Sequence, residues 1–348
     1  MKRALMISLL VLAALLTAPA GAGATSLSWR PSPTGTDAQL RGLSAVSRHV
    51  AWASGARGTV LRTVDGGRSW QQVGPPDAAA LDFRDIEAFD ARTAVALSIG
   101  EGESSRIYRT TDGGRTWTES FRNTEPAAFY NCLAFFDARN GLAVGDPVAG
   151  EFRVLTTADG GRTWSRVPAA GLPPALPGEY EFSASGQCVT VAGHKDAWLA
   201  TGGSTVARVL HSGDRGRTWT ASETPLASSA SAGVFAVAFR DPRTGVAVGG
   251  DYANPDTGVD ALALTRDGGR TWREPVTAPS GYRSAVVYHP FLPTGLIAVG
   301  PTGSDLSLDG GRHWHQFSDA NLDSVDCTRD GACWASGAKG AAATLTLG

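Results

Sequence analysis

The sequence predicts an all-β fold, a single seven-bladed β-propeller, and three observations carry that prediction. A short motif, typified by Thr-Asp-Gly-Gly-Arg-Thr-Trp at residues 111–117, occurs six times. Its copies recur at roughly 40 to 55 residues, a period typical of an array of one supersecondary unit. Between the copies, short apolar strands alternate with turn residues, and no long segment keeps a helical period. Finally, the two ends of the chain supply complementary parts of one further unit.

Each copy of the motif predicts a tight turn between two strands. The aspartate can accept hydrogen bonds from backbone N–H groups of its own turn, and glycine allows a positive φ. The tryptophan begins the outgoing strand and offers a large apolar face for burial. We therefore expect structural roles, and not catalytic ones, for these residues. The aspartates are Asp65, Asp112, Asp159, Asp214, Asp267 and Asp309, and the tryptophans are Trp70, Trp117, Trp164, Trp219, Trp272 and Trp314.

The strand pattern within one unit sets the number of blades. In the first unit the expected strands cover residues 40–47, 49–55, 59–64 and 69–73. After the sixth motif, residues 322–347 provide three more strands and then the chain stops. The segment Ser26-Leu-Ser-Trp29 resembles the missing outgoing strand. We therefore expect the N-terminal strand to complete the last blade, because closure removes exposed sheet edges. Three further tryptophans, Trp52, Trp198 and Trp334, fall at matching positions on second strands.

The first 24 residues are typical of a secretory signal peptide. Lys2 and Arg3 precede an apolar run over residues 4–16, and Ala22-Gly-Ala24 follows. The run is too short for a membrane span, which needs about 20 residues. No cysteine lies near the expected cleavage point. We therefore expect a mature chain of residues 25–348 that is periplasmic or secreted, is not a lipoprotein, and has no membrane span.

Composition excludes several classes of function. The chain has 31 basic and 33 acidic residues, and the leader contains two of the basic ones. The mature chain is therefore mildly acidic, which argues against nucleic-acid binding, because that function needs a basic stripe. There is no G-x-G-x-x-G before a helix and no C-x-x-C. The six histidines are scattered. We expect no cofactor, no metal and a monomer.

Four cysteines, an even number, fit an exported protein. Cys327 and Cys333 flank the turn between the first two strands of the last unit, which predicts a hairpin disulfide. Cys132 and Cys188 occupy equivalent positions on the inner strands of neighbouring units. They either join those two blades or remain two separate buried thiols.

Two segments interrupt the repeat, and such interruptions often carry function. They are residues 168–187 and residues 249–258. Both connect strands where loops can reach the central face.

Arginines form a second candidate feature. Arg41, Arg84 and Arg283 lie near the starts of three first strands, close to the expected channel mouth. Three converging arginines would bind a carboxylate or a phosphate. The alternative is that they form structural ion pairs with neighbours such as Asp85 and Asp323.

The repeated motif resembles the Asp-box, also called the BNR repeat, of sialidase-like β-propellers. In those families it is a structural turn away from the ligand face. Further segments resemble a family of exported bacterial BNR-repeat propellers whose members are often labelled oxidoreductase or glycosyl hydrolase. The blades are also similar to the photosystem II stability and assembly factor propellers, which implies a binding role. The segments that resemble the exported bacterial BNR-repeat family are residues 125–130, 145–147, 178–186, 249–252, 281–284 and 303–305.

These observations favour a binding or assembly module for a protein or glycan partner in the cell envelope. The partner is expected on the face opposite the Asp-boxes. The predicted ligand-binding residues are Arg41, Arg84, Arg283, Tyr282, Tyr252, Tyr130 and Asp305.

The alternative function is a glycoside hydrolase with its site at the channel mouth. A retaining glycosidase needs two carboxyl groups about 5 Å apart. Glu179, Asp146 and Asp251 are the candidate catalytic residues. The resemblance to sialidases implies an arginine triad and a Tyr–Glu pair. However, the Phe/Tyr-Arg-Ile-Pro motif of those enzymes is absent, and they have six blades.

Overall fold

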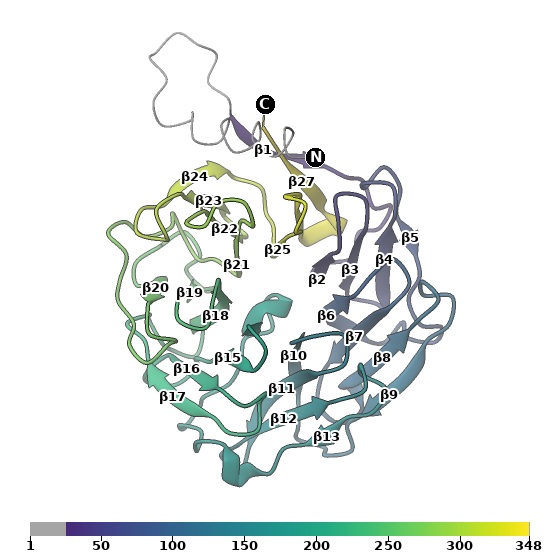
Figure 1. Cartoon of the computed structure of the whole chain (residues 1–348), viewed down its shortest axis with the longest axis horizontal. Coiled ribbons are helices and arrows are strands. Elements are labelled where there is room, and N and C mark those ends of the chain that lie inside the picture. The colour runs from purple at the N-terminus through teal and green to yellow at the C-terminus, as the bar shows by residue number, and fades with distance from the viewer. Residues whose placement is uncertain (1–25, 348) are drawn as a thin grey trace.

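Seven antiparallel sheets surround a central channel in the structure, a computed structural model that describes residues 26–347 (Figure 1). The predicted seven-bladed propeller is therefore confirmed. The predicted signal peptide, residues 1–24, lies outside the described residues. Among residues 26–347, no helix is long and apolar enough to cross a membrane.

In each blade the strands run in order from the channel outward. Blade one contains β2 (Leu40–Ala45), β3 (Ala51–Gly55), β4 (Thr59–Thr63) and β5 (Gln71–Gln72). Blade two contains β6 (Asp82–Ala88), β7 (Ala94–Ile99), β8 (Arg106–Thr110) and β9 (Thr118–Arg122). Blade three contains β10 (Tyr130–Phe135), β11 (Gly141–Val148), β12 (Glu151–Thr157) and β13 (Ser165–Arg166). Blade four contains β14 (Val189–Ala192), β15 (Asp196–Ala200), β16 (Arg208–Ser212) and β17 (Thr220–Glu223).

The remaining blades complete the ring. Blade five contains β18 (Ala232–Phe239), β19 (Gly245–Asp251) and β20 (Leu262–Thr265). Blade six contains β21 (Ala285–Tyr288), β22 (Leu296–Gly300), β23 (Gly303–Ser307) and β24 (His315–Ser318). Blade seven contains β25 (Ser324–Cys327), β26 (Cys333–Ser336), β27 (Ala342–Leu347) and β1 (Leu27–Pro31). Four short 3-10 helices lie in loops of the described part of the chain: η2 (Gly102–Ser104), η3 (Ala169–Gly171), η4 (Gly186–Cys188) and η5 (Ala338–Gly340).

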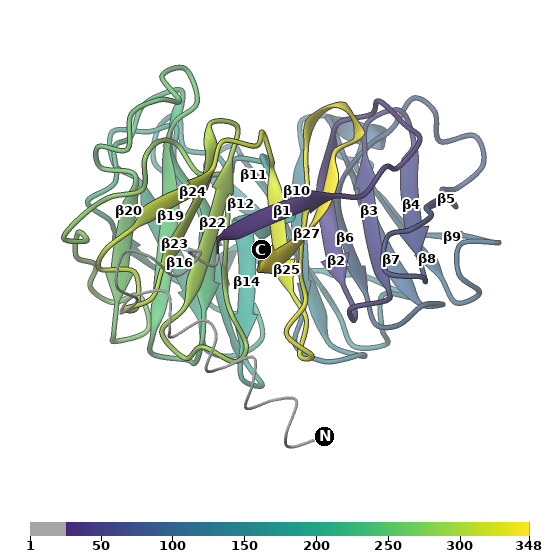
Figure 2. The same cartoon turned by 90° about the horizontal axis from the view of Figure 1, so that it is seen from above.

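The ring is closed by the N-terminal strand, as predicted. β1 pairs antiparallel with β27, in a register from Leu27 opposite Leu347 to Pro31 opposite Ala343. Figure 2 shows β1 lying across the outer side of β27. Closure gives the last blade its fourth strand from the other end of the chain.

The outer strands of blades one and five are shorter than the sequence predicted, and local chemistry explains why. In blade one, Ser69 donates from its N–H and hydroxyl to the Asp65 carboxylate, so it belongs to the turn. In blade five the fourth strand is reduced to one bridge between Leu264 and Arg273. Pro275 follows two residues later and has no N–H to continue the ladder.

The box turns are structural units. The Asp112 carboxylate accepts from the N–H of Thr116 at 2.9 Å and from the hydroxyls of Thr110 and Thr116 at 2.9 and 2.7 Å. Gly113 and Gly114 have φ of 80° and 81°, a region that favours glycine. Hydrogen bonds, first from Thr116, lower the pKa of Asp112 to about 2. The box aspartate therefore stays ionised and is occupied by its own turn.

Tryptophans pack between neighbouring blades. Trp52, Trp198 and Trp334 are fully buried. The Trp52 ring meets the box tryptophan Trp117 of the next blade edge-on, with centroids 6.4 Å apart. The Trp52 Nε1–H donates to the carbonyl of Asp90 at 3.1 Å. These three buried rings add apolar area at blade interfaces, and the indole N–H of each is hydrogen-bonded to a backbone carbonyl.

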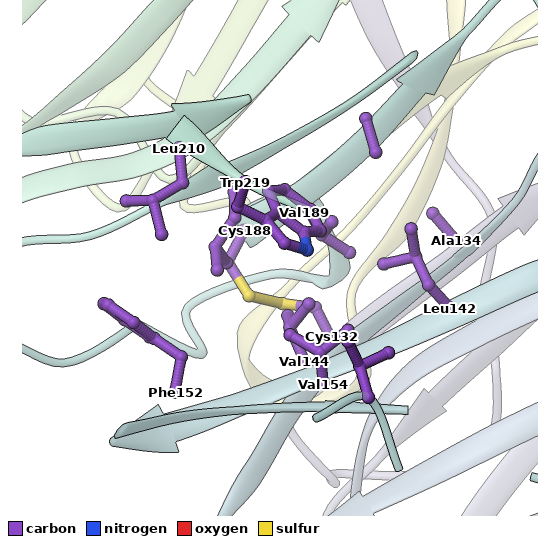
Figure 3. Close-up of a cluster of buried hydrophobic side chains, with 13 residues drawn as sticks. Cys132, Ala134, Leu142, Val144, Phe152, Val154, Cys188, Val189, Leu210 and Trp219 are labelled. Atoms are coloured by element: carbon purple, nitrogen blue, oxygen red, sulfur yellow. A yellow bond between two sulfur atoms is a disulfide. The ribbon is translucent and has the colours of Figure 1, made fainter. Parts of the chain in front are cut away.

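Both cysteine pairs form disulfides. Cys327 joins Cys333 across β25 and β26, and Cys132 joins Cys188 between blades three and four. The second pair lies within a buried apolar cluster that includes Phe152 (Figure 3). The alternative of two separate thiols at Cys132 and Cys188 is therefore wrong.

The insertion at residues 168–187 turns inward and enters the channel, where η4 lies at the centre of the ring (Figure 1). The Gln187 amide donates to the Val325 carbonyl at 2.8 Å and accepts from the Val286 N–H at 2.8 Å. The Ser185 hydroxyl donates to the Ser284 carbonyl at 2.8 Å. These bonds reach blades six and seven, so the insertion acts as a plug of the channel. We call residues 183–188 the channel plug.

Candidate binding site

A pocket of about 500 Å³ lies above the channel plug. Its walls come from the starts of inner strands and from loops that join second to third strands or adjacent blades. The box turns join third to fourth strands. Because neighbouring strands are antiparallel, the pocket lies at the end of the sheets opposite the boxes.

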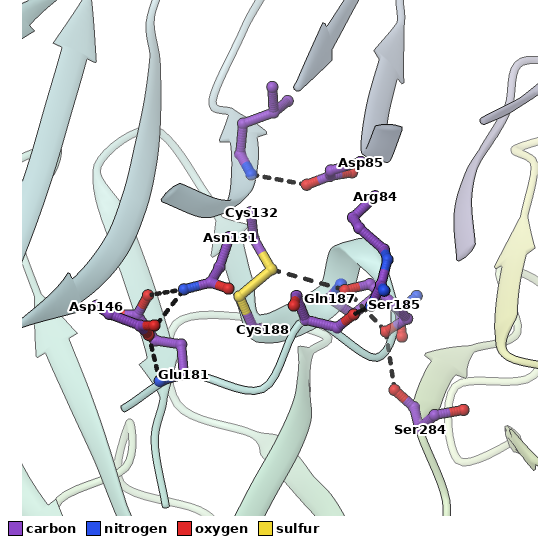
Figure 4. The surroundings of a disulfide bond; sticks show 12 residues. Arg84, Asp85, Asn131, Cys132, Asp146, Glu181, Ser185, Gln187, Cys188 and Ser284 are labelled. Carbon is purple, nitrogen blue, oxygen red and sulfur yellow. Dashed lines mark hydrogen bonds between the residues drawn. A yellow bond between two sulfur atoms is a disulfide. The ribbon is translucent and has the colours of Figure 1, made fainter. Parts of the chain in front are cut away.

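The plug forms the floor of the pocket and is held from several sides. Ser183 and Ala184 line the pocket directly. The Arg84 Nη1 donates to the Ser183 carbonyl at 2.7 Å, and Cys188 is tied to Cys132 (Figure 4). The floor is therefore a fixed surface.

One wall carries two arginines. Arg41 and Arg84 both line the pocket, and their side chains are 26% and 21% exposed. Arg84 Nε donates to Asp82 Oδ2 at 2.9 Å, whereas Arg41 Nε lies 3.9 Å from Asp323 Oδ2. Burial and the neighbouring Arg41 charge lower the pKa of Arg84. Each of these two arginines thus has a carboxylate neighbour, Asp82 for Arg84 and Asp323 for Arg41, and both guanidinium groups remain partly exposed to the pocket.

The third predicted arginine lies elsewhere. Arg283 is fully buried, and its Nε donates to Asp305 Oδ2 at 2.6 Å. Neither Arg283 nor Asp305 lines the pocket. The structure therefore does not bring three arginines together, because a neighbouring carboxylate holds Arg283 inside blade six. Asp85, offered as an ion-pair partner, instead accepts from the N–H groups of Ile86 and Leu133.

A second wall is aromatic. The Phe182 ring stacks on Phe235 with centroids 4.0 Å apart, and Tyr282 meets Phe235 edge-on at 4.7 Å. Tyr252 is 52% exposed and forms the rim. The structure thus places the predicted residues Tyr282 and Tyr252 in the pocket. Tyr130 is buried against Phe121 and does not line it.

A third part of the pocket, the acidic corner, consists of Asp146, Glu181 and Asn131. The Asn131 Nδ2 donates to Asp146 Oδ1 and to Glu181 Oε2, both at 2.9 Å (Figure 4). The Glu181 N–H also donates to Asp146 Oδ1 at 2.9 Å. Burial raises the pKa of Asp146 to about 6. Burial and then the Asp146 charge raise the pKa of Glu181 well above its usual range.

The other two candidate catalytic carboxyls do not line the pocket. The Glu179 side chain is buried in an ion pair with Arg208, whose Nε lies 2.8 Å from Glu179 Oε1. Asp251 caps its own loop by accepting from Ala253 N and Asn254 Nδ2. Of the three, only Asp146 reaches the pocket.

Sequence reasoning missed several pocket residues. Glu181 and Phe182 lie within the insertion at residues 168–187, so the interruption of the repeat could have identified them as pocket candidates. Asn131 and Phe235 lie on inner strands, and no sequence pattern distinguishes them from core residues.

A family model described as photosynthesis system II assembly factor YCF48 matches residues 99–222. No curated protein matches the chain by sequence.

Solved structures show the same fold at low identity. YCF48 from Cyanidioschyzon merolae is 18% identical with a TM-score of 0.64, covering 91% of this chain and 98% of that one. A structure of YCF48 bound to D1 peptide is 16% identical with a TM-score of 0.63, covering 91% and 96%. The WD40 propeller domain of Doa1 is 10% identical with a TM-score of 0.61, covering 92% and 97%. The protein is thus a seven-bladed propeller with BNR-type repeats, similar to the YCF48 assembly factors.

Proposed function

We propose that this protein is a binding and assembly module that takes a segment of a partner protein into the pocket opposite the box turns. The observation that carries the proposal is the composition of that pocket. It offers an exposed aromatic rim, a polar wall that carries Arg41 and Arg84, and a fixed floor. Concave sites with apolar walls and a few placed polar groups are typical of ligand sites.

The structural neighbour that holds a D1 peptide supports a peptide as the kind of ligand. Aromatic and arginine side chains are also the residues that most often dominate protein interfaces. The leader pattern in residues 1–24 supports a partner in the cell envelope or outside the cell.

The proposal is tested by panning a displayed random peptide library against the mature protein. Selected peptides are then measured for affinity with wild type, Arg41→Gln and Tyr252→Ala. Arg41 makes no side-chain hydrogen bond within residues 26–347, and Tyr252 is half exposed. Both variants should therefore fold normally. We expect each to weaken binding by about ten-fold, the effect of losing an interface anchor.

The matched control is Arg68→Gln, which changes an exposed arginine of a box turn on the other face. Its affinity should equal that of wild type. Peptides that bind all variants equally, or a library that yields no binder while glycans bind, would overturn the proposal.

The glycoside hydrolase alternative has less support. Its three candidate carboxyls are Glu179, Asp146 and Asp251, and the pocket contains only Asp146. Glu179 is held by Arg208, so it is not available as a nucleophile in this arrangement.

A further inference from the structure

We infer that the acidic corner of the pocket is a subsite for a cationic side chain of the bound segment, the ammonium of lysine or the guanidinium of arginine. This inference rests on the proposed function and adds the chemistry of the ligand. It assigns Asp146 as the residue that meets the cation, with Glu181 and Asn131 behind it.

The first observation is that the carboxyl groups of Asp146 and Glu181 have no basic partner among the described residues. Three other carboxyls near this face have an arginine within 4.0 Å: Glu179 has Arg208, Asp305 has Arg283 and Asp323 has Arg41. Within residues 26–347, neither Asp146 nor Glu181 has any basic group within that distance. Two adjacent buried carboxyls without a cation are costly to ionise, and an incoming cation favours their ionised forms.

The second step is a set of unused hydrogen-bond acceptors. Glu181 is 3% exposed and Asn131 is 1% exposed, and both line the pocket. Glu181 Oε1 and Asn131 Oδ1 are buried without a hydrogen-bond partner. Buried polar atoms are nearly always paired in native proteins, so orphaned oxygens need an explanation. A bound donor supplies one.

Access to the corner is through Asp146. It is the more exposed of the two carboxyl residues, and its Oδ1 alone is used within the described residues. Oδ2 is therefore free to accept from a ligand. A cation at Oδ2 also stabilises the ionised form of the neighbouring Glu181 across a short, poorly solvated distance.

The third step is the aromatic surroundings. Tyr180, Phe182 and Tyr252 line the same pocket, and the Tyr180 and Phe182 rings are 4.7 Å apart. Tyr180 and Asp146 line the same pocket, and burial, followed by the charges of Tyr252 and Asp146, raises the pKa of Tyr180. Carboxylate together with aromatic faces is a favourable setting for an ammonium or guanidinium group.

An organic cation fits better than a metal ion. Ca²⁺ takes six to eight oxygen ligands. Here three polar side chains meet aromatic walls. Within residues 26–347, no group of three or more His, Cys, Asp and Glu side chains is arranged to hold a metal ion.

The test extends the peptide selection to Asp146→Asn, panned in parallel with wild type. Peptides from wild type should share one position rich in lysine or arginine, and peptides from the variant should not. In the best wild-type peptide, that residue is then replaced by norleucine. The replacement should weaken binding to wild type by about ten-fold or more, and binding to Asp146→Asn by less than about two-fold.

The control variant is Asp256→Asn, an exposed carboxyl outside the pocket, which should behave as wild type. If Asp146→Asn does not fold, Glu181→Gln replaces it with the same expectation. Peptides that depend on Arg41 and Tyr252 but carry no coupled basic residue would overturn this inference and leave the proposed function standing. Titration of wild type with CaCl₂ that shows binding, absent from Asp146→Asn, would also overturn it.

Discussion

Cys132 on the inner strand β10 and Cys188 at the end of η4 form a disulfide that ties the channel plug to blade three (Figure 4). The plug is also the floor of the pocket, because Ser183 and Ala184 line it. The disulfide thus fixes the channel plug, which forms the floor of the candidate site, to the ring of blades.

Loss of this disulfide should destabilise the protein more than loss of the other. The cysteines are 56 residues apart, against six for Cys327 and Cys333. The chain-entropy model gives about 4 kcal/mol for the larger loop and about 2 kcal/mol for the smaller. Urea unfolding of Cys132→Ser/Cys188→Ser and Cys327→Ser/Cys333→Ser measures both. Equal losses would show that loop size does not govern the effect.

The Arg283–Asp305 pair should be important for stability. Both side chains are buried, and Asp305→Ala leaves the guanidinium without its carboxylate. We expect a loss of about 3–5 kcal/mol, because the uncompensated charge remains inside. Urea unfolding measures it, with exposed Asp256→Ala as the control. A loss below about 1 kcal/mol would mean that water reaches Arg283.

The contribution of Glu87, which lies in the channel, to the free energy of unfolding should decrease as the pH rises. Burial and the charges of Asp326 and Asp85 raise the pKa of Glu87 to about 8, from an ordinary value near 4.5. The folded state therefore holds its proton more tightly, and that stabilisation is lost between about pH 4.5 and 8.

The variant Glu87→Gln cannot titrate, so its stability should depend less on pH in this window. The expected change in slope is at most about 1.4 kcal/mol per pH unit, the value for one proton. Unfolding free energies at pH 5, 6.5 and 8 measure it. Exposed Glu223→Gln is the control and should keep the slope of wild type.

The box aspartates should have the opposite pH dependence: their contribution to stability should decrease as the pH falls. Asp267 accepts from Thr271 N–H, Thr271 Oγ1 and Thr265 Oγ1, and these bonds, first from the Thr271 hydroxyl, lower its pKa to about 2. Its contribution is present above the ordinary value near 4 and is lost as the pH falls towards 2.

Asp267→Asn should therefore be less stable than wild type at pH 7, and the difference should shrink between pH 4 and pH 2. Thermal unfolding across this range measures the difference. Asp256→Asn, whose carboxylate makes no hydrogen bond within residues 26–347, should show no such trend. A difference that stays constant with pH would rule out the carboxylate charge as the cause.

The repeat could be predicted from the sequence because its causes are local. The box turns, with Asp112 bonded to its own turn and Gly114 at positive φ, depend on residues within one hairpin. The blade count and the closing strand β1 followed, because each unit must bury the same faces against its neighbours. The sequence analysis expected four strands in blade five, where the structure has three. The proline at position 275 is the sequence feature that explains the missing fourth strand.

The candidate site was predicted less completely. Of the residues proposed from the sequence, those that line the pocket are Arg41, Arg84, Tyr252, Tyr282 and Asp146. Their positions at strand starts and in loops of one face are readable from the order of strands. The charge partners of a side chain are not readable in this way.

Glu179 and Glu181 illustrate the difference. They are two residues apart in the same insertion and look equivalent in the sequence. Glu179 is neutralised by Arg208, 29 residues later in the chain. Glu181 lies behind Asp146, and no basic group of residues 26–347 forms an ion pair with it. Similarly, Arg283 forms a buried ion pair with Asp305 and therefore does not line the pocket.

The propeller, its box turns and its closure can be predicted from the amino-acid sequence, because they arise from short-range patterns that repeat. Which charged residues are paired and which face the pocket can be seen only in the folded structure. Such pairing depends on contacts between distant segments, and the energy of a buried charge is set by those contacts rather than by its neighbours in the chain.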